Sequence, residues 1–191
     1  MDSEGIEHRE GIIKLRVLNM LRADIIKQEN DSRCDARRFL RREIDQYLCI
    51  YGKNQRFAET AYLFSDNSIL VEFRRFVHPF QFPQPKHLTR EHAVVYASQA
   101  ACIFFGIMAE TRPEWPFSQS ELILGLLEER ALIHKICIKF SKMMELNEPT
   151  SVKMSLKNYR ENDKKVWFFS TLDFKIGHTC YGEMGCVLLR K

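Results

Sequence analysis

The sequence predicts an α+β fold in which a curved antiparallel sheet wraps around one long central helix. Two observations lead to this prediction. The segment from Thr89 to Glu110 is almost wholly apolar and contains many small residues, which is typical of a helix buried against a sheet. On both sides of it the chain alternates in strand-like fashion between turn-forming segments. An antiparallel sheet has to curve around such a helix in order to bury it.

The segments on either side of the central helix contain the expected strands. Before it, residues 57–64 and 69–77 are rich in aromatic and β-branched residues, and the turn-forming residues 65–68 between them predict a β-hairpin. After it, the chain alternates four times between apolar and polar residues. The four expected strands cover residues 132–144, 152–159, 166–176 and 180–189.

Capping residues mark the ends of the helices. Thr89 is the expected N-cap of the central helix, and Arg112 and Pro113 are expected to end it. Ser118 or Ser120 is expected to cap a shorter helix that runs through Glu128.

The N-terminal part of the sequence predicts two further helices. Residues 6–28 place isoleucines and leucines among charges at helical spacing, and residues 34–48 continue as a second helix after a polar break. Five arginines belong to this second segment, namely Arg33, Arg37, Arg38, Arg41 and Arg42. They form either a solvated helix face or a contact for an anion or an acidic carrier protein. We therefore expect an N-terminal helical extension over residues 1–42 and one domain over residues 43–191.

Composition restricts the class of protein. The 191 residues suit one packed domain, and a hydrophobic content of 45% excludes a disordered chain. A net charge of +4 is mild; it suits a phosphorylated ligand or an acidic carrier protein and does not favour nucleic acid. The six cysteines include no CxxC pair and no histidine at zinc-site spacing, so we expect reduced thiols, no metal and no cofactor.

No segment indicates a membrane span or export. The longest apolar stretches, such as Ala97–Ala109, are shorter than a bilayer span. The first ten residues, MDSEGIEHRE, are acidic and polar, whereas a secretory signal begins with basic residues that precede an apolar run. These features predict a cytoplasmic protein.

A stripe of polar residues follows the central helix. Thr89, His92, Tyr96 and Gln99 stand at i, i+3, i+7 and i+10, on one face of an otherwise apolar helix. Buried polar groups require partners, so the stripe either bonds to the preceding proline-rich loop and to backbone groups or lines a pocket. The first helical turn also presents unpaired N–H groups, which could stabilise the oxyanion of a thioester carbonyl. His92 is then either a base or a structural histidine.

Common catalytic motifs are absent from the sequence. It contains no GxSxG, P-loop, GxGxxG or HExxH pattern, which argues against several hydrolase and nucleotide-binding classes. His78, His87, His92, Asp66 and Glu91 could be grouped as metal ligands, but their spacing matches no recognised metal site.

Short motifs resemble a known family. They are Asp45-Gln46-Tyr47, then Ala61-Tyr62 through Asp66-Asn67-Ser68-Ile69-Leu70, then His87-Leu88-Thr89 with Gln99 ten residues after Thr89, and finally the segment Tyr181 to Val187. With these motifs, residues 43–189 resemble FcoT-like fatty acyl-CoA thioesterases, a branch of the hot-dog superfamily. The resemblance implies the hot-dog fold, in which a curved sheet wraps around the central helix.

The resemblance also implies site residues. Tyr47 matches a tyrosine among the family's proposed active-site groups, and His87 and Gln99 match their counterparts. Thr89 and Ser98 each replace a family asparagine. A further family tyrosine, in the loop before the helix, falls near Phe82 or Pro83.

A fatty acyl-thioester hydrolase is the leading functional prediction. The thioester would be carried by coenzyme A or an acyl carrier protein, with its carbonyl at the Thr89 end of the central helix. The predicted catalytic residues are Tyr47, Thr89, His92 and Ser98. The predicted substrate-binding residues are Tyr62, Phe82, His87, Tyr96, Gln99 and Phe104. The resemblance further implies a homodimer or a larger homo-oligomer.

Two alternatives remain open at the level of sequence. A dehydratase or conjugate-addition enzyme would act on an unsaturated or 3-hydroxy acyl thioester without releasing the thiol. A non-catalytic acyl-binding module would bind the same group without turnover, with the arginine-rich segment docking an acidic partner.

Overall fold

The structure is a computed structural model, which describes residues 36–75, 86–143, 150–162, 164 and 166–189. The chain divides into two compact units, Met1–Ala36 and Arg37–Lys191, and the second contains nearly all of the described residues. The helix predicted over residues 6–28 lies outside the described residues, as does most of the proline-rich loop, residues 78–85.

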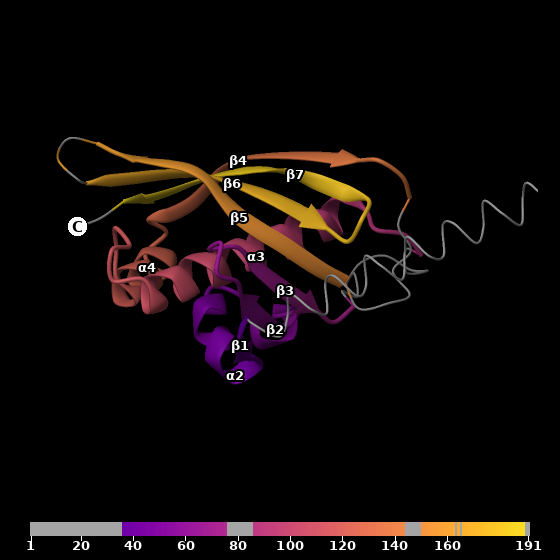
Figure 1. The fold of residues 1–191 in the computed structure, drawn as a ribbon, viewed down its shortest axis with the longest axis horizontal. Helices are drawn as coiled ribbons and strands as arrows, with labels where there is room; N and C mark the ends of the chain where they lie inside the picture. The colour runs from indigo at the N-terminus through magenta and orange to yellow at the C-terminus, as the bar shows by residue number, and fades with distance from the viewer. Residues whose placement is uncertain (1–35, 76–85, 144–149, 163, 165, 190–191) are drawn as a thin grey trace, which may run out of the picture. The chain divides into compact units, whose positions relative to one another are not determined.

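One antiparallel sheet forms most of the second unit. Its strand order is β1-β2-β3-β5-β6-β7-β4, and every neighbouring pair is antiparallel. Figure 1 shows this sheet with the long helix α3 packed against it. The strands are β1 (Arg37–Leu40), β2 (Ala58–Leu63), β3 (Ile69–Phe73), β4 (Ala131–Phe140), β5 (Thr150–Glu161), β6 (Trp167–Ile176) and β7 (Cys180–Leu189). The predicted hairpin and the four later strands are confirmed.

The helix predicted over residues 34–48 is wrong in its first half. Arg37–Leu40 forms the edge strand β1, which pairs with β2 and buries Phe39. Only Arg41–Ile44 (α2) and the 3-10 turn Asp45–Leu48 (η1) are helical. The spacing of arginines and apolar residues fitted a helix, but pairing with β2 and burial of Phe39 override that local preference. Arg37 and Arg38 thus lie on a strand, and Arg41 and Arg42 lie on a short helix, instead of sharing one helix face. Arg33 lies outside the described residues.

Helix α3 (Arg90–Thr111) is the central helix that the sequence predicts. Thr89 is its N-cap, and Arg112, directly before Pro113, ends it. Every residue from Tyr96 to Met108 is buried. Among the described residues, α3 is long and apolar enough to cross a membrane, whereas the sequence predicted no segment of that length. However, 83% of its most apolar stretch is buried inside the protein. That burial is typical of a core helix.

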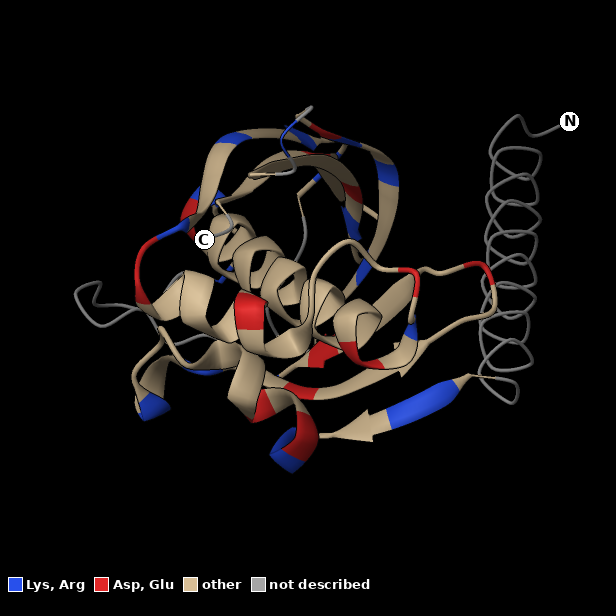
Figure 2. Ribbon diagram, turned by 90° about the vertical axis from the view of Figure 1, so that its left-hand side faces the viewer, with Lys and Arg blue, Asp and Glu red and all other residues tan. Residues whose placement is uncertain are grey.

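Small residues allow other elements to approach α3 closely. A Cβ atom added at Gly106 would lie 2.2 Å from Cδ1 of Tyr47, so the tyrosine ring packs where only glycine leaves room. Ser118 caps the shorter helix α4 (Gln119–Leu127), as predicted. Figure 2 shows the strands curving around α3, with charged residues on those strands.

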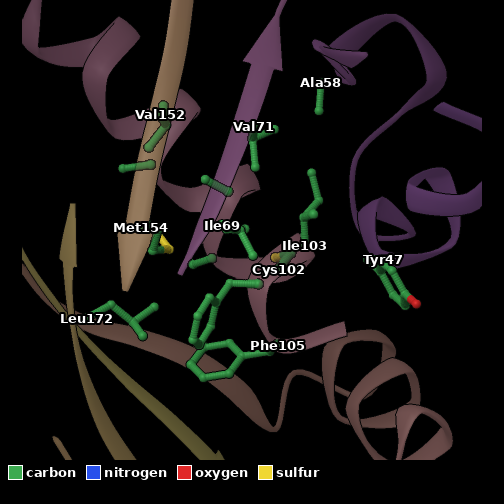
Figure 3. Close-up of a cluster of buried hydrophobic side chains, with 14 of the residues drawn as sticks. Tyr47, Ala58, Ile69, Val71, Cys102, Ile103, Phe105, Val152, Met154 and Leu172 are labelled. Carbon is green, nitrogen blue, oxygen red and sulfur yellow. The ribbon is translucent and has the colours of Figure 1, made fainter. Parts of the chain in front are cut away.

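The hydrophobic core lies between α3 and the inner face of the sheet. Figure 3 shows Ile103 and Phe105 of α3 close to apolar side chains of three neighbouring strands. These strand residues are Ile69 and Val71 of β3, Val152 and Met154 of β5, and Leu172 of β6. Alternation along each strand brings them to one face, and their burial provides the main driving force for wrapping the sheet.

Gln99 attaches α3 to the chain that leads into β2. Its side chain is fully buried; its Oε1 accepts a hydrogen bond from the N–H of Phe57 at 2.9 Å, and its Nε2 donates to the carbonyl of Gln55 at 2.6 Å. The carbonyl of Gln55 and the N–H of Phe57 lie between the 3-10 turn η2 (Lys53–Gln55) and β2. Because they lie outside a regular helix or strand, they depend on a side-chain partner. Both amide atoms of Gln99 are therefore engaged in holding the fold.

Replacing Gln99 with methionine is expected to lower the free energy of unfolding by about 2–6 kcal/mol, because two backbone groups lose their partner at roughly 1–3 kcal/mol each. Methionine keeps the length of the side chain, so little packing is lost. Urea denaturation followed by tryptophan fluorescence measures the effect, and Gln46→Met, at an exposed position, is the control. Equal stability of Gln99→Met and wild type would show that this contact does not support the fold.

Candidate functional site

An apolar cavity of about 170 Å³ lies between α3, α4 and the sheet. Small and apolar side chains of both helices face it, and β6 and β7 provide the opposite wall. The lining includes Ala101, Cys102 and Phe105 of α3, Leu122 and Leu126 of α4, and Phe168, Ser170, Cys186 and Leu188 of the sheet. A concave, mostly apolar space with a few polar atoms is typical of a small-molecule site.

The cavity opens beside the first residues of β4. Ile50, Leu132 and Ile133 line it and are also exposed, with 48%, 56% and 41% of their surface accessible. In contrast, Phe168 and Leu188 on the far wall are 1% and 4% exposed. A ligand would therefore enter between Ile50 and β4, the edge strand of the sheet.

Two hydroxyl groups, those of Tyr51 and Ser98, lie beside the cavity. Tyr51 lines it, with its side chain near that of Ser98, whose Oγ donates to the carbonyl of Val94 at 2.7 Å. Ser98 precedes the lining residues Ala101 and Cys102 by three and four positions, which places it on the same face of α3. Burial raises the pKa of Tyr51 well above its usual range, so its hydroxyl stays protonated and can donate a hydrogen bond.

Two buried thiols also line the cavity. Burial raises the pKa of Cys102 to about 12, and it raises the pKa of Cys186 as well. Both thiols are therefore protonated at neutral pH, and thiols in this state are poor nucleophiles. They act as small apolar parts of the wall.

Thr89 and His92 cap the N-terminus of α3. The Oγ1 of Thr89 lies 2.7 Å from Nδ1 of His92, and the N–H of Thr89 donates to the same nitrogen at 3.4 Å. Because a backbone N–H can only donate, Nδ1 is the acceptor, and the proton of the neutral ring lies on Nε2. His92 is almost fully buried at 1% exposure. This geometry gives both residues a structural function, and catalysis by either one stays a prediction.

The helix cap lies far from the cavity within one chain. Thirteen residues separate Thr89 from Cys102, which corresponds to roughly 20 Å along a helix. The structure thus brings Ser98 to the cavity, but not Thr89 or His92.

Tyr47 lies at the other end of α3. It is fully buried, and its hydroxyl donates to Oε2 of Glu110 at 2.5 Å, while Arg37 forms an ion pair with the same carboxylate at 3.2 Å. Burial, followed by the hydrogen bond and the charge of Glu110, raises its pKa above the usual range. Tyr47 therefore joins η1 and β1 to the end of α3, and the structure does not bring it together with Thr89.

The predicted substrate-binding residues that the structure describes lie outside the cavity lining. Tyr62 is half-buried on β2 and donates to Glu72 at 3.4 Å, and Tyr96 packs on Phe73 with ring centroids 4.9 Å apart. Phe104 packs against Phe105 and Trp115 in the core. His87 is half-buried directly before α3, the Gln99 amide bonds to backbone, and Phe82 lies outside the described residues.

Sequence reasoning missed Tyr51 and Ser170. Ser170 could have been found, because it alternates with Phe168 and Leu172 on β6 and so shares their buried face. Tyr51 lies in an irregular segment between η1 and η2, where no periodicity indicates which way a side chain points. Within the described ranges, no three His, Cys, Asp or Glu side chains gather as a metal site would require.

Comparisons with known proteins provide evidence on the fold. No family model matches the sequence, and no curated protein matches it. Among solved structures, the dehydratase heterocomplex ApeI:P from Xenorhabdus doucetiae is similar with a TM-score of 0.50 and 14% identity, over 78% of this chain and 91% of that one.

Two further solved structures are thioesterases. 4-Hydroxybenzoyl-CoA thioesterase from Pseudomonas sp. strain CBS-3 has a TM-score of 0.42 and 12% identity, over 63% of this chain and 84% of that one. A hypothetical thioesterase with coenzyme A from Streptococcus pneumoniae TIGR4 has a TM-score of 0.40 and 10% identity, over 66% of this chain and 81% of that one. At these identities the likeness concerns architecture alone. The predicted fold is confirmed: this chain has a hot-dog fold.

Proposed function

We propose that this chain is an FcoT-like cytoplasmic hydrolase, which cleaves an acyl thioester of coenzyme A or of an acyl carrier protein. One observation supports the proposal most strongly. In a hot-dog fold, an apolar cavity opens beside a pair of hydroxyl groups, one on the central helix (Ser98) and one on the chain that crosses it (Tyr51). The cavity suits an acyl chain, and the hydroxyl groups suit the carbonyl to which the chain is attached.

The acyl chain would lie in the cavity, where burial of apolar surface stabilises it by roughly 25 cal/mol per Å². The carbonyl would then lie beside Tyr51 and Ser98. As water attacks the carbonyl carbon, negative charge develops on its oxygen, and the Tyr51 hydroxyl can donate to that oxygen. Collapse of the intermediate breaks the carbon–sulfur bond and releases the carboxylic acid and the thiol.

A second copy of the chain is the proposed protein partner. Strand β4 is an edge of the sheet, and it exposes Leu132 and Ile133 beside the cavity mouth and Phe140 at its other end. Exposed edges with apolar side chains favour pairing with another strand. Pairing of β4 with its copy would cover the mouth. Sedimentation equilibrium should give twice the chain mass of 22.6 kDa, and Ile133→Glu should shift the chain toward monomer; a monomeric wild type would contradict the proposal.

A non-catalytic acyl-binding module is the second candidate. The lining residues that the structure describes include no His, Asp or Glu, so none of them can act as the acid–base group. Tight binding of acyl-CoA without release of thiol would favour this candidate over the hydrolase.

Tyr51→Phe is expected to lower kcat for acyl-CoA hydrolysis at least tenfold, because it removes the hydroxyl that donates to the carbonyl oxygen. Thiol release from acyl-CoA esters of four to twelve carbons measures turnover, and thermal melting checks that the variant folds. Tyr181→Phe, at a tyrosine that is 48% exposed on β7, is the control and should leave kcat unchanged. Wild-type kcat in Tyr51→Phe would contradict this site.

A further inference from the structure

We infer that the cavity selects a short acyl group of about six carbons that carries a neutral hydrogen-bonding group, and that Ser170 recognises this group. The inference rests on the proposed function, because it specifies the acyl group whose thioester is cleaved. Three features of the cavity lead to it: its volume, one unpaired hydroxyl and the neutrality of its wall.

The volume limits the size of the occupant. The cavity measures about 170 Å³. An apolar protein cavity of roughly 150 Å³ binds benzene, a six-carbon ligand. An acyl group of similar size fills the present cavity, whereas a long fatty chain has to leave most of its length outside.

Ser170 provides a hydrogen-bonding group inside the cavity. Its side chain lines the cavity, the residue is 4% exposed, and its Oγ has no hydrogen-bond partner among the described residues. Thr150 and Thr179 also have buried unpaired hydroxyls in the described ranges, but neither lines the cavity. A buried hydroxyl without a partner costs roughly 1–3 kcal/mol, and a ligand that supplies the partner removes this cost.

The surroundings of Ser170 require a neutral ligand group. Cys186 faces Ser170 on the neighbouring strand, and its thiol, like that of Cys102, is protonated. Among the described residues, the remaining wall around them is aliphatic and aromatic, with no charged side chain. A carboxylate or ammonium group would lose its hydration here without gaining an opposite charge. A hydroxyl or keto group is therefore the fitting class of partner.

Binding of small neutral probes tests the inference without a thioester. Benzene and phenol are titrated into the full-length protein and followed by NMR, and the ratio of their Kd values is compared between wild type, Ser170→Ala and Thr179→Ala. We expect both probes to bind wild type, and Ser170→Ala to reduce the preference for phenol over benzene at least tenfold while benzene still binds. Thr179→Ala, which removes an unpaired hydroxyl outside the cavity, should leave the ratio unchanged.

The other outcomes overturn the inference. Exclusion of both probes from wild type would show that the cavity holds no ligand of this size. An unchanged ratio in Ser170→Ala would show that the hydroxyl does not recognise the ligand, for example because it holds only a structural water. A failure of the proposed function can be distinguished from a failure of this inference. In that case hexanoyl-CoA and 6-hydroxyhexanoyl-CoA would release no thiol, but Ser170→Ala would still reduce the preference for phenol over benzene.

Discussion

The structure depends on the burial of α3 inside the curved sheet. The segment of α3 from His92 to Ala109 contains no charged side chain. Such a helix is shielded from water only if other elements cover it on every side. The sheet covers one side, α4 and η1 cover others, and small residues such as Gly106 set how closely each can approach. Polar groups on the helix must then find partners inside the protein. Gln99 finds them in the backbone before β2, and Tyr96 donates to the carbonyl of Arg74.

The candidate site follows from the same packing. Ala101 and Cys102 are too small to reach the sheet fully at the place where Phe168 and Leu188 line the opposite wall, so a cavity remains between them. Close packing elsewhere makes such a space costly unless a ligand fills it. The hydroxyls of Tyr51 and Ser98 lie next to this space because the chain between η1 and η2 crosses beside that face of α3. An apolar space beside hydroxyl groups matches the two parts of an acyl thioester.

The fold could be predicted from the sequence because its signals are local. The N-cap at Thr89, the cap at Ser118 and the alternation along β5 to β7 are each set by a few neighbouring residues. Strand β1 was not predicted, because its four residues look helical in isolation and become a strand only by pairing with β2.

The site was harder to predict than the fold. The resemblance pointed to Tyr47, Thr89 and Ser98 together. In the structure, Thr89 caps the N-terminus of α3, Ser98 lies near the middle of α3, and Tyr47 packs against its C-terminal end. Sequence spacing cannot show that Tyr47 bonds to Glu110 or that the Thr89 hydroxyl bonds to His92, since both depend on how the elements pack. Ser170 is the exception, because strand alternation alone places it on the buried face.

The central claim is that the acyl part of a thioester lies in the cavity between α3, α4 and the sheet. Intermolecular NOEs between the terminal methyl group of a non-hydrolysable S-hexyl-pantetheine thioether and the protein test it most directly. The account predicts NOEs to the methyl groups of Leu126 and Leu188, on opposite walls of the cavity. NOEs that instead reach only residues near Thr89, or none at either wall while the ligand binds, would contradict it.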